Sequence, residues 1–173
     1  MSRFFLEVPD DISSVGTTSV TSVTTERDVL QVHISGEEAR VPRSIGLIYG
    51  IVHKTAQGLG NGSGGPIYGE MTIGSAHKVI LAMMMYTGLG EDSKFVDVGC
   101  GVGKMNFHVA QYPGVEFSYG IEIEHVRWFL GCSSLNNLVK KGAIANNCHL
   151  DHGDVNMIKT FSPMTHVYQF DIG

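Results

Sequence analysis

Cysteine is scarce in this sequence, and its three cysteines lie far apart. Cys100, Cys132 and Cys148 form no close pair within the 173 residues. Disulfide-dense scaffolds and zinc knuckles need such pairs, so the sequence excludes both classes. The pattern is typical of a protein from a reducing compartment.

Long apolar runs and basic clusters are also missing. No stretch of about 18 apolar residues occurs, which predicts no membrane-spanning helix. Glu7 and Pro9 interrupt the start of the chain, unlike a secretory signal peptide. Charged residues make up 17% of the chain, and the formal net charge is −5. The chain therefore suits phosphate backbones poorly, and we expect DNA contact to be indirect or made by other segments.

The remaining composition is that of a folded domain, with 43% hydrophobic residues. We expect an N-terminal arm over residues 1–44, partly flexible because residues 10–25 are rich in Ser, Thr, Val and Gly. The folded domain covers residues 45–173. Within it, the glycine-rich segment 58–66 predicts a loop, either a connector or a lid.

Helical and strand patterns alternate along the folded part. A first helix is predicted over residues 44–57, with Ser44 as its N-cap. The other expected helices and strands cover, in turn, helices 75–86, 103–111, 124–141 and 154–161, and strands 95–98, 117–121, 148–150 and 166–170. This alternation predicts an α/β fold with a parallel sheet and helices on both faces. Such sheets bind ligands at the carboxyl ends of their strands.

A glycine-rich motif follows the first of these strands. It reads V-D-V-G-C-G-V-G at residues 96–103, and a second acid, Glu122, ends the next strand roughly 20 residues further on. Glycines permit a tight turn and a close approach between backbone and ligand. A carboxylate at the end of the second strand is placed to accept hydrogen bonds from a ribose diol.

Two ligand classes use this layout, and the acids favour one of them. A dinucleotide fingerprint requires Gly or Ala where this chain has Lys104, and Asp97 would repel a pyrophosphate. S-adenosylmethionine carries a sulfonium, an ammonium and a ribose but no phosphate, so it is the favoured cofactor. A tight turn without a ligand is disfavoured because Asp97 and Glu122 stand in register with the glycines. After the third strand, Asp154 is either an adenine contact or an ordinary helix N-cap.

The order of these motifs resembles one enzyme family. The chain is similar to the disruptor-of-telomeric-silencing family, the non-SET histone lysine methyltransferases. The similarity lies in the order of Ile67-Tyr68-Gly69-Glu70, a helix, the glycine motif and then Tyr119-Gly120-Ile121-Glu122. The resemblance implies a class I, Rossmann-like methyltransferase domain, of which residues 45–173 are the N-terminal part. It also implies a loop that closes over the methyl donor at Tyr68, Gly69 and Glu70, and further donor contacts at Asp97, Gly99, Gly101, Gly103, Lys104, Glu122, Asp154 and Val155.

The chain departs from the family pattern in three places. Lys104 replaces an uncharged polar residue, and Val155 stands where an aromatic residue is common. The family's Asn-Asn-Phe-Ala-Phe run corresponds here to Phe170-Asp171-Ile172-Gly173, which places Asp171 near the sulfonium. Such a variant is associated with divergent protozoan, kinetoplastid-like members. The catalytic candidates are Asp171 and Glu70, which would stabilise the cationic donor or accept a proton through water.

The resemblance implies a nuclear chromatin regulator. Its reaction would transfer a methyl group to a lysine in the globular core of histone H3 within nucleosomes. Two alternatives stay open: a methyltransferase acting on another protein or a small molecule, and a non-catalytic S-adenosylmethionine-binding module. The second arises because the sheet is expected to be truncated after its fourth strand.

Other notable residues are assigned to packing. His149 and His152 share a metal-like spacing, but across a turn, so we expect no metal site. We expect His77 and His108 to be exposed or half-buried, and Cys100 to fill space in the glycine turn. Trp128 and Phe129 are predicted to pack their helix on the sheet.

Overall fold

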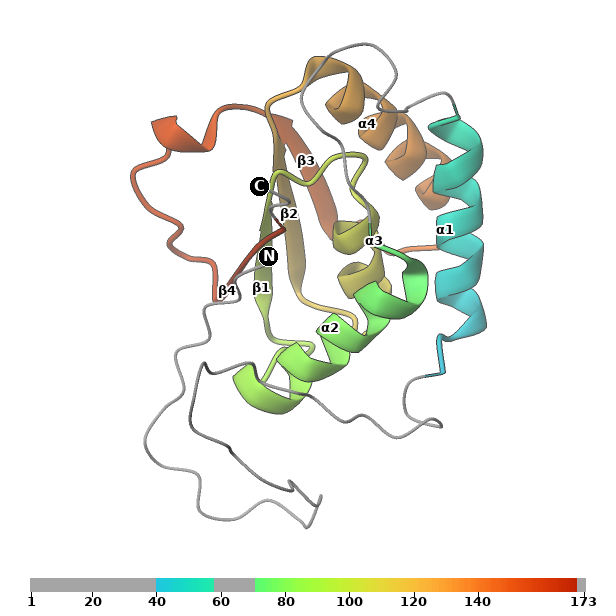
Figure 1. Ribbon diagram of the computed structural model, residues 1–173, viewed down its shortest axis with the longest axis horizontal. Helices are drawn as coiled ribbons and strands as arrows, with labels where there is room; N and C mark the ends of the chain where they lie inside the picture. Colours follow the sequence, from blue (N-terminus) through green and yellow to red (C-terminus); the bar gives the residue numbers. More distant parts are fainter. Residues whose placement is uncertain (1–39, 58–70, 171–173) are drawn as a thin grey trace, which may run out of the picture.

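A four-stranded parallel sheet forms the centre of the molecule (Figure 1). The computed structural model describes residues 40–57 and 71–170. The strands are β1 (Lys94–Val98), β2 (Phe117–Glu122), β3 (Cys148–His152) and β4 (His166–Gln169), in the order β3-β2-β1-β4. The predicted α/β fold with a parallel sheet is thus confirmed, but the α-helices of the described residues do not cover both faces as predicted.

The four helices lie on one side of this sheet, as Figure 1 shows. They are α1 (Arg43–Thr55), α2 (Ile73–Thr87), α3 (Lys104–Gln111) and α4 (His125–Lys140). The crossovers from β1 to β2 and from β2 to β3 move in the same direction across the sheet, so right-handed connections place α3 and α4 on the same face. The connection from β3 to β4 crosses back and runs on the other side, where it carries the short 3-10 helix η1 (Val155–Met157).

Several predicted elements differ from the observed ones, and three of these differences have a local cause. α1 begins at Arg43 because the Pro42 carbonyl accepts the first helical hydrogen bonds, so Ser44 is not its N-cap. α2 begins at Ile73, since the Thr72 side chain accepts a hydrogen bond from the Ser75 backbone N–H. The helix predicted over residues 154–161 is wrong. Only η1 forms there, and the chain returns to an extended conformation at Ile158.

The helices bury their apolar faces against the sheet in two clusters. Phe107, Ile48 and Leu138 belong to the cluster between α1, α3 and α4, and Phe95 and Ile80 to the cluster under α2. Full burial of each such side chain contributes roughly 1.5–3 kcal/mol. The first cluster holds α1 against α3 and α4, and the second holds α2 against β1 and α3.

Three predictions about single aromatic and histidine positions need correction or confirmation. Trp128 packs as expected, and its indole N–H donates to the Leu150 carbonyl at 3.1 Å. Phe129 is 55% exposed, because it lies on the outer face of α4. His77 and His108 are not exposed or half-buried: 1% and 0% of their surfaces are accessible.

No helix among the described residues has the length and hydropathy needed to cross a membrane.

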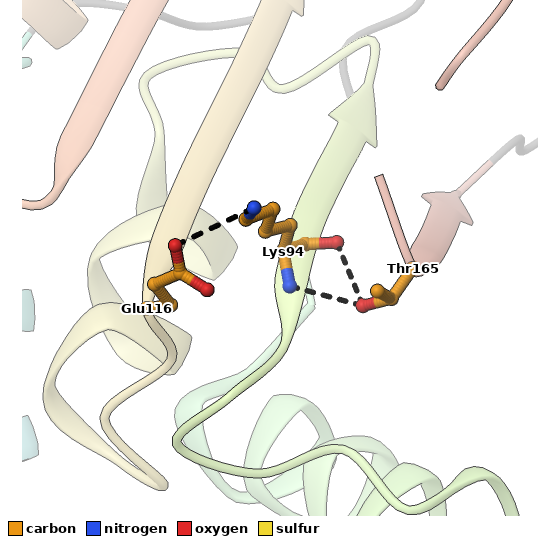
Figure 2. Close-up of polar contacts among 3 residues, drawn as sticks. All are labelled: Lys94, Glu116 and Thr165. Carbon is orange, nitrogen blue, oxygen red and sulfur yellow. Dashed lines mark hydrogen bonds and ion pairs between the residues drawn. The ribbon is translucent and has the colours of Figure 1, made fainter. Parts of the chain in front are cut away.

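The amino end of β1 is fixed between its two neighbouring strands. Figure 2 shows Thr165, just before β4, accepting a hydrogen bond from the Lys94 N–H at 2.9 Å and donating one to the Lys94 carbonyl at 3.1 Å. On the other side, the Lys94 ammonium lies 3.5 Å from the Glu116 carboxylate, just before β2. These contacts help set the register that brings the opposite, carboxyl ends of the strands together.

Candidate functional site

The carboxyl ends of all four strands open into one cleft of about 390 Å3. The turn between β1 and α3 lies in it, and α1 and α4 also contribute side chains. This is the position at which parallel α/β sheets bind ligands. The sequence predicted a site at this edge, and the structure has a concave surface there.

The turn after β1 folds back onto the end of β2. Gly99, Gly101 and Gly103 have φ angles of 75°, 58° and 80°, a left-handed conformation that favours glycine. The backbone N–H groups of Gly99 and Cys100 both donate to the Ile121 carbonyl, at 2.9 and 3.0 Å. The turn is therefore held against β2, and its backbone borders the cleft at Gly99 and Gly101.

Glu122 is a buried carboxylate with two fixed hydrogen bonds. Its Oε2 accepts from the Gly101 N–H at 2.7 Å, and its Oε1 accepts from the Glu124 N–H at 2.9 Å. The residue is 3% exposed and lines the cleft. Hydrogen bonds from backbone N–H groups stabilise an ionised carboxylate and orient it. Glu122 thus presents an oriented carboxylate at the end of β2.

Asp97 lies beside this carboxylate but differs from it in its partners. It is 4% exposed, lines the cleft, and receives no hydrogen bond from the residues that the structure describes. Burial, together with the neighbouring Glu122 charge, raises the pKa of Asp97 to about 8. Asp97 is therefore largely protonated at neutral pH, and a cationic group beside it would favour its ionised form.

The end of β3 supplies the third predicted contact. Asp154 and Val155 both line the cleft. The Asp154 carboxylate accepts hydrogen bonds from the Asn156 backbone N–H at 2.9 Å and from the Asn156 side-chain amide at 2.8 Å. Asp154 is thus the N-cap of η1. Its role as an adenine contact stays a prediction.

Comparison with protein families decides where this chain belongs. The sequence model of the family described as "Histone methylation protein DOT1" matches residues 53–159, more than half of the chain. This chain belongs to the DOT1 family. The match includes the glycine turn, Glu122 and Asp154, so the predicted resemblance is confirmed. A search of curated protein sequences finds no significant match.

Solved structures similar to this DOT1-family chain include several methyltransferases. S-adenosylmethionine-dependent methyltransferases from Thiobacillus denitrificans and Geobacter sulfurreducens, both in complex with S-adenosyl-L-homocysteine, are each 18% identical, with TM-scores of 0.49 and 0.47. In both comparisons 75% of this chain aligns with 43% of the other. An RNA methyltransferase from Salinibacter ruber is 23% identical over 53% of this chain and 56% of its own, with a TM-score of 0.44. The chain therefore spans less than two thirds of the length of each of these proteins.

Two residues of the predicted glycine turn have packing roles in this DOT1-family chain. Gly103 does not line the cleft; a Cβ there would lie 2.7 Å from the Phe107 ring and 3.0 Å from a Leu150 methyl group. It lets α3 start directly against the sheet. Cys100 is buried as expected, and burial raises the pKa of its thiol well above the ordinary value. It therefore remains a thiol.

Several cleft residues were not predicted from the sequence. Tyr49, Ile123, Arg127 and Tyr168 line the cleft together with the predicted Lys104. Ile123 directly follows the predicted ligand contact Glu122. Of these four residues it is therefore the one that the sequence could have indicated. The others come from α1, α4 and β4, and only the packing of these elements brings them to the cleft.

The remaining predictions concern positions beyond the described part of the chain. Tyr68, Gly69, Glu70 and Asp171 lie outside the described residues, as does the loop over residues 58–66. Among the residues that the structure does describe, no three His, Cys, Asp or Glu side chains are grouped as metal ligands.

Proposed function

We propose that this DOT1-family chain forms the donor-binding part of a histone methyltransferase, which transfers a methyl group from S-adenosylmethionine to a lysine in the globular core of histone H3. The observation that carries the proposal is the pair of buried acids, Asp97 and Glu122, at the carboxyl ends of two neighbouring parallel strands. Both face one cleft together with the glycine turn. The family match favours histone over other substrates.

The chemistry of these groups fits the proposed cofactor. The Glu122 carboxylate is oriented by two backbone N–H groups, which suits hydrogen bonds from the two hydroxyls of a ribose. Asp97 has no donor from the described residues and suits an ammonium group. A pyrophosphate would bring two negative charges to the Glu122 carboxylate and would oppose the ionisation of Asp97, so a dinucleotide fits poorly.

The proposed reaction is an in-line displacement at a methyl carbon. The bound donor supplies a methyl group on a positively charged sulfur, and the neutral lysine amine is the nucleophile. The chain's own residues hold the nucleoside through Glu122 and border the β4 end of the cleft with the apolar side chains of Met71 and Phe170. An apolar channel lowers the pKa of a lysine ammonium by desolvation, and alignment of the amine, the methyl carbon and the sulfur supplies much of the rate.

The catalytic candidates extend this proposal beyond the described residues. Asp171 and Glu70 are proposed to stabilise positive charge near the reacting atoms or to accept the lysine proton through water. Tyr68 and Gly69 are proposed to close over the donor. The proposed partner is histone H3 in nucleosomes, and the proposed location is the nucleus.

Two measurements test the proposal. Calorimetric titration with S-adenosylmethionine should show saturable binding to the full chain, and labelled methyl transfer should then be assayed on nucleosomes, free H3 and small-molecule mixtures. Transfer to nucleosomal H3 is the expected result. Binding without any transfer favours a donor-binding module, whereas transfer to a small molecule or another protein overturns the histone assignment.

A further inference from the structure

A hydrogen-bonded row of three side chains leads from the cleft into the helical layer. The Tyr49 hydroxyl on α1 lies 3.3 Å from Nδ1 of His108 on α3, and Nε2 of His108 lies 3.1 Å from Nδ1 of His77 on α2. The two imidazole rings are stacked with centroids 5.3 Å apart, and the Tyr49 ring meets His108 edge-on. Tyr49 also lines the cleft, whereas neither histidine does.

The two histidines form a neutral pair. One proton at most fits between Nε2 of His108 and Nδ1 of His77, because two N–H groups would otherwise point at each other. Burial lowers the pKa of His77, and burial together with His77 lowers the pKa of His108 to about 3. At neutral pH His108 Nδ1 therefore either accepts the Tyr49 O–H or donates to its oxygen, and in both tautomers the hydroxyl has a fixed partner.

The strand order gives the cleft two ends. Glu122 and Asp154 lie at the ends of β2 and β3, whereas Tyr168 comes from β4, on the opposite side of β1. If the ribose binds at Glu122, the nucleoside occupies the β2–β3 end. The amino-acid portion of the donor then extends toward the β1–β4 end, where Tyr49 packs against the apolar cluster that contains Tyr168, and where Tyr49, Tyr168 and Asp97 all line the cleft.

We propose that Tyr49 positions the amino-acid portion of the methyl donor, and that the His108–His77 pair fixes the orientation of Tyr49 for this purpose. The inference rests on the proposed function, because it assumes that the donor binds in this cleft. A side chain that is already held by a buried partner loses little conformational freedom when the ligand arrives, which favours binding. This gives the two buried histidines a role that packing alone would not require.

Ligands of two lengths test the proposal in the full chain. S-adenosylhomocysteine reaches both ends of the cleft, whereas adenosine occupies only the nucleoside end. Tyr49→Phe removes the hydroxyl and keeps the ring, so we expect roughly three- to tenfold weaker binding of S-adenosylhomocysteine, the effect of one neutral hydrogen bond, and unchanged binding of adenosine. Tyr112→Phe is the matched control. The Tyr112 ring packs on His77, with ring centroids 5.3 Å apart, but it does not line the cleft.

Changes at His108 test the second half of the proposal. His108→Leu should weaken S-adenosylhomocysteine binding as Tyr49→Phe does. His108→Asn places an amide near the position of Nδ1 and should restore the affinity. Equal affinities of Tyr49→Phe and the unmodified chain for S-adenosylhomocysteine would overturn the inference, as would an equal loss for both ligands, which indicates general damage. If the unmodified chain binds neither ligand, the proposed function itself fails.

Discussion

Two neighbouring acids show how local partners decide the state of a side chain. Glu122 and Asp97 are both almost fully buried, yet backbone N–H groups bind the first, and no donor among the described residues binds the second. Hydrogen bonds to the charged form favour ionisation, whereas burial without them opposes it. At this scale the cleft therefore combines a carboxylate held by backbone N–H groups with an acid whose charge depends on what lies beside it.

Replacing Glu122 by Ala should weaken donor binding by roughly 1–3 kcal/mol, because the change removes hydrogen bonds to a charged, buried group. Calorimetric titration with S-adenosylhomocysteine measures the effect. Glu116→Gln is the control, since Glu116 precedes the same strand but is exposed and remote from the cleft. An unchanged affinity in Glu122→Ala would remove this residue from the site.

Donor affinity should increase as the pH rises toward 8 and then level off. The pKa of Asp97 is about 8 in the folded chain, so below this value a ligand ammonium must displace the Asp97 proton. Titrations in two buffers of different ionisation enthalpy should report proton release at pH 7. In Asp97→Asn this component should disappear, and proton release equal to that of the unmodified chain would refute the assignment.

At the scale of elements, the first turn of α3 depends on the absence of a side chain. Gly103 has a φ of 80° and its neighbours leave no space for a Cβ. The same approach brings α3 close enough to the sheet for Phe107 to be fully buried. The glycine motif thus combines residues that border a ligand with one that brings a helix close to the sheet.

Gly103→Ala should lower the free energy of unfolding by about 1–3 kcal/mol, through backbone strain and the contact with Phe107. Denaturant unfolding measures it. Gly50→Ala is the matched control, because Gly50 lies in the interior of α1 and a Cβ added there would meet no atom within 4 Å. That change should stabilise the chain by roughly 0.5–1 kcal/mol. Similar effects of both substitutions would contradict the packing role.

The buried row of Tyr49, His108 and His77, which joins three helices, should make the free energy of unfolding sensitive to acid. The pKa of His108 is lowered to about 3 in the folded chain, whereas an unfolded histidine titrates near 6.5. The folded state then binds fewer protons, so stability decreases as the pH falls below about 6.5. Asp97 shifts in the opposite sense, so the comparison is between slopes. Unfolding at pH 7.5 and 5.5 should show a smaller loss in His108→Asn than in the unmodified chain, and His53→Gln, on the exposed face of α1, should not change the slope.

At the scale of the whole molecule, the chain is negative overall, and its buried acids Asp97 and Glu122 lie in one cleft. The net charge of −5 opposes binding to a polyanion. The helices cover one side of the sheet in the described part of the chain, and the cleft lies at the edge where the strands end. The proposed recognition of a nucleosome would therefore proceed through histone contacts.

The chain should show no measurable affinity for duplex DNA at about 150 mM salt, because it lacks the basic cluster that releases counterions. A gel-shift titration with a short duplex tests this, with a basic DNA-binding domain as positive control. Tight DNA binding by the chain alone would contradict the expectation that DNA contact is indirect or made by other segments.

The sequence by itself determined the alternation of strands and helices, and the acids and glycines at the ends of β1 and β2. These signals are local, because a strand end, a glycine turn and a following helix lie within a few residues of one another. The signal that predicted a helix over residues 154–161 was also local, but it was wrong. The Asp154 side chain caps a short turn there, and this turn competes with helix formation.

Only the tertiary structure decided which residues meet at the cleft from distant elements. Tyr49 and Tyr168 are far apart in sequence, and they reach the same cleft because α1 packs on α3 and β4 pairs with β1. Likewise, His77 and His108 carry no signal of burial in the sequence, since their positions on two helices acquire meaning only when those helices pack together. Long-range packing depends on many weak contacts at once, and no short motif encodes it.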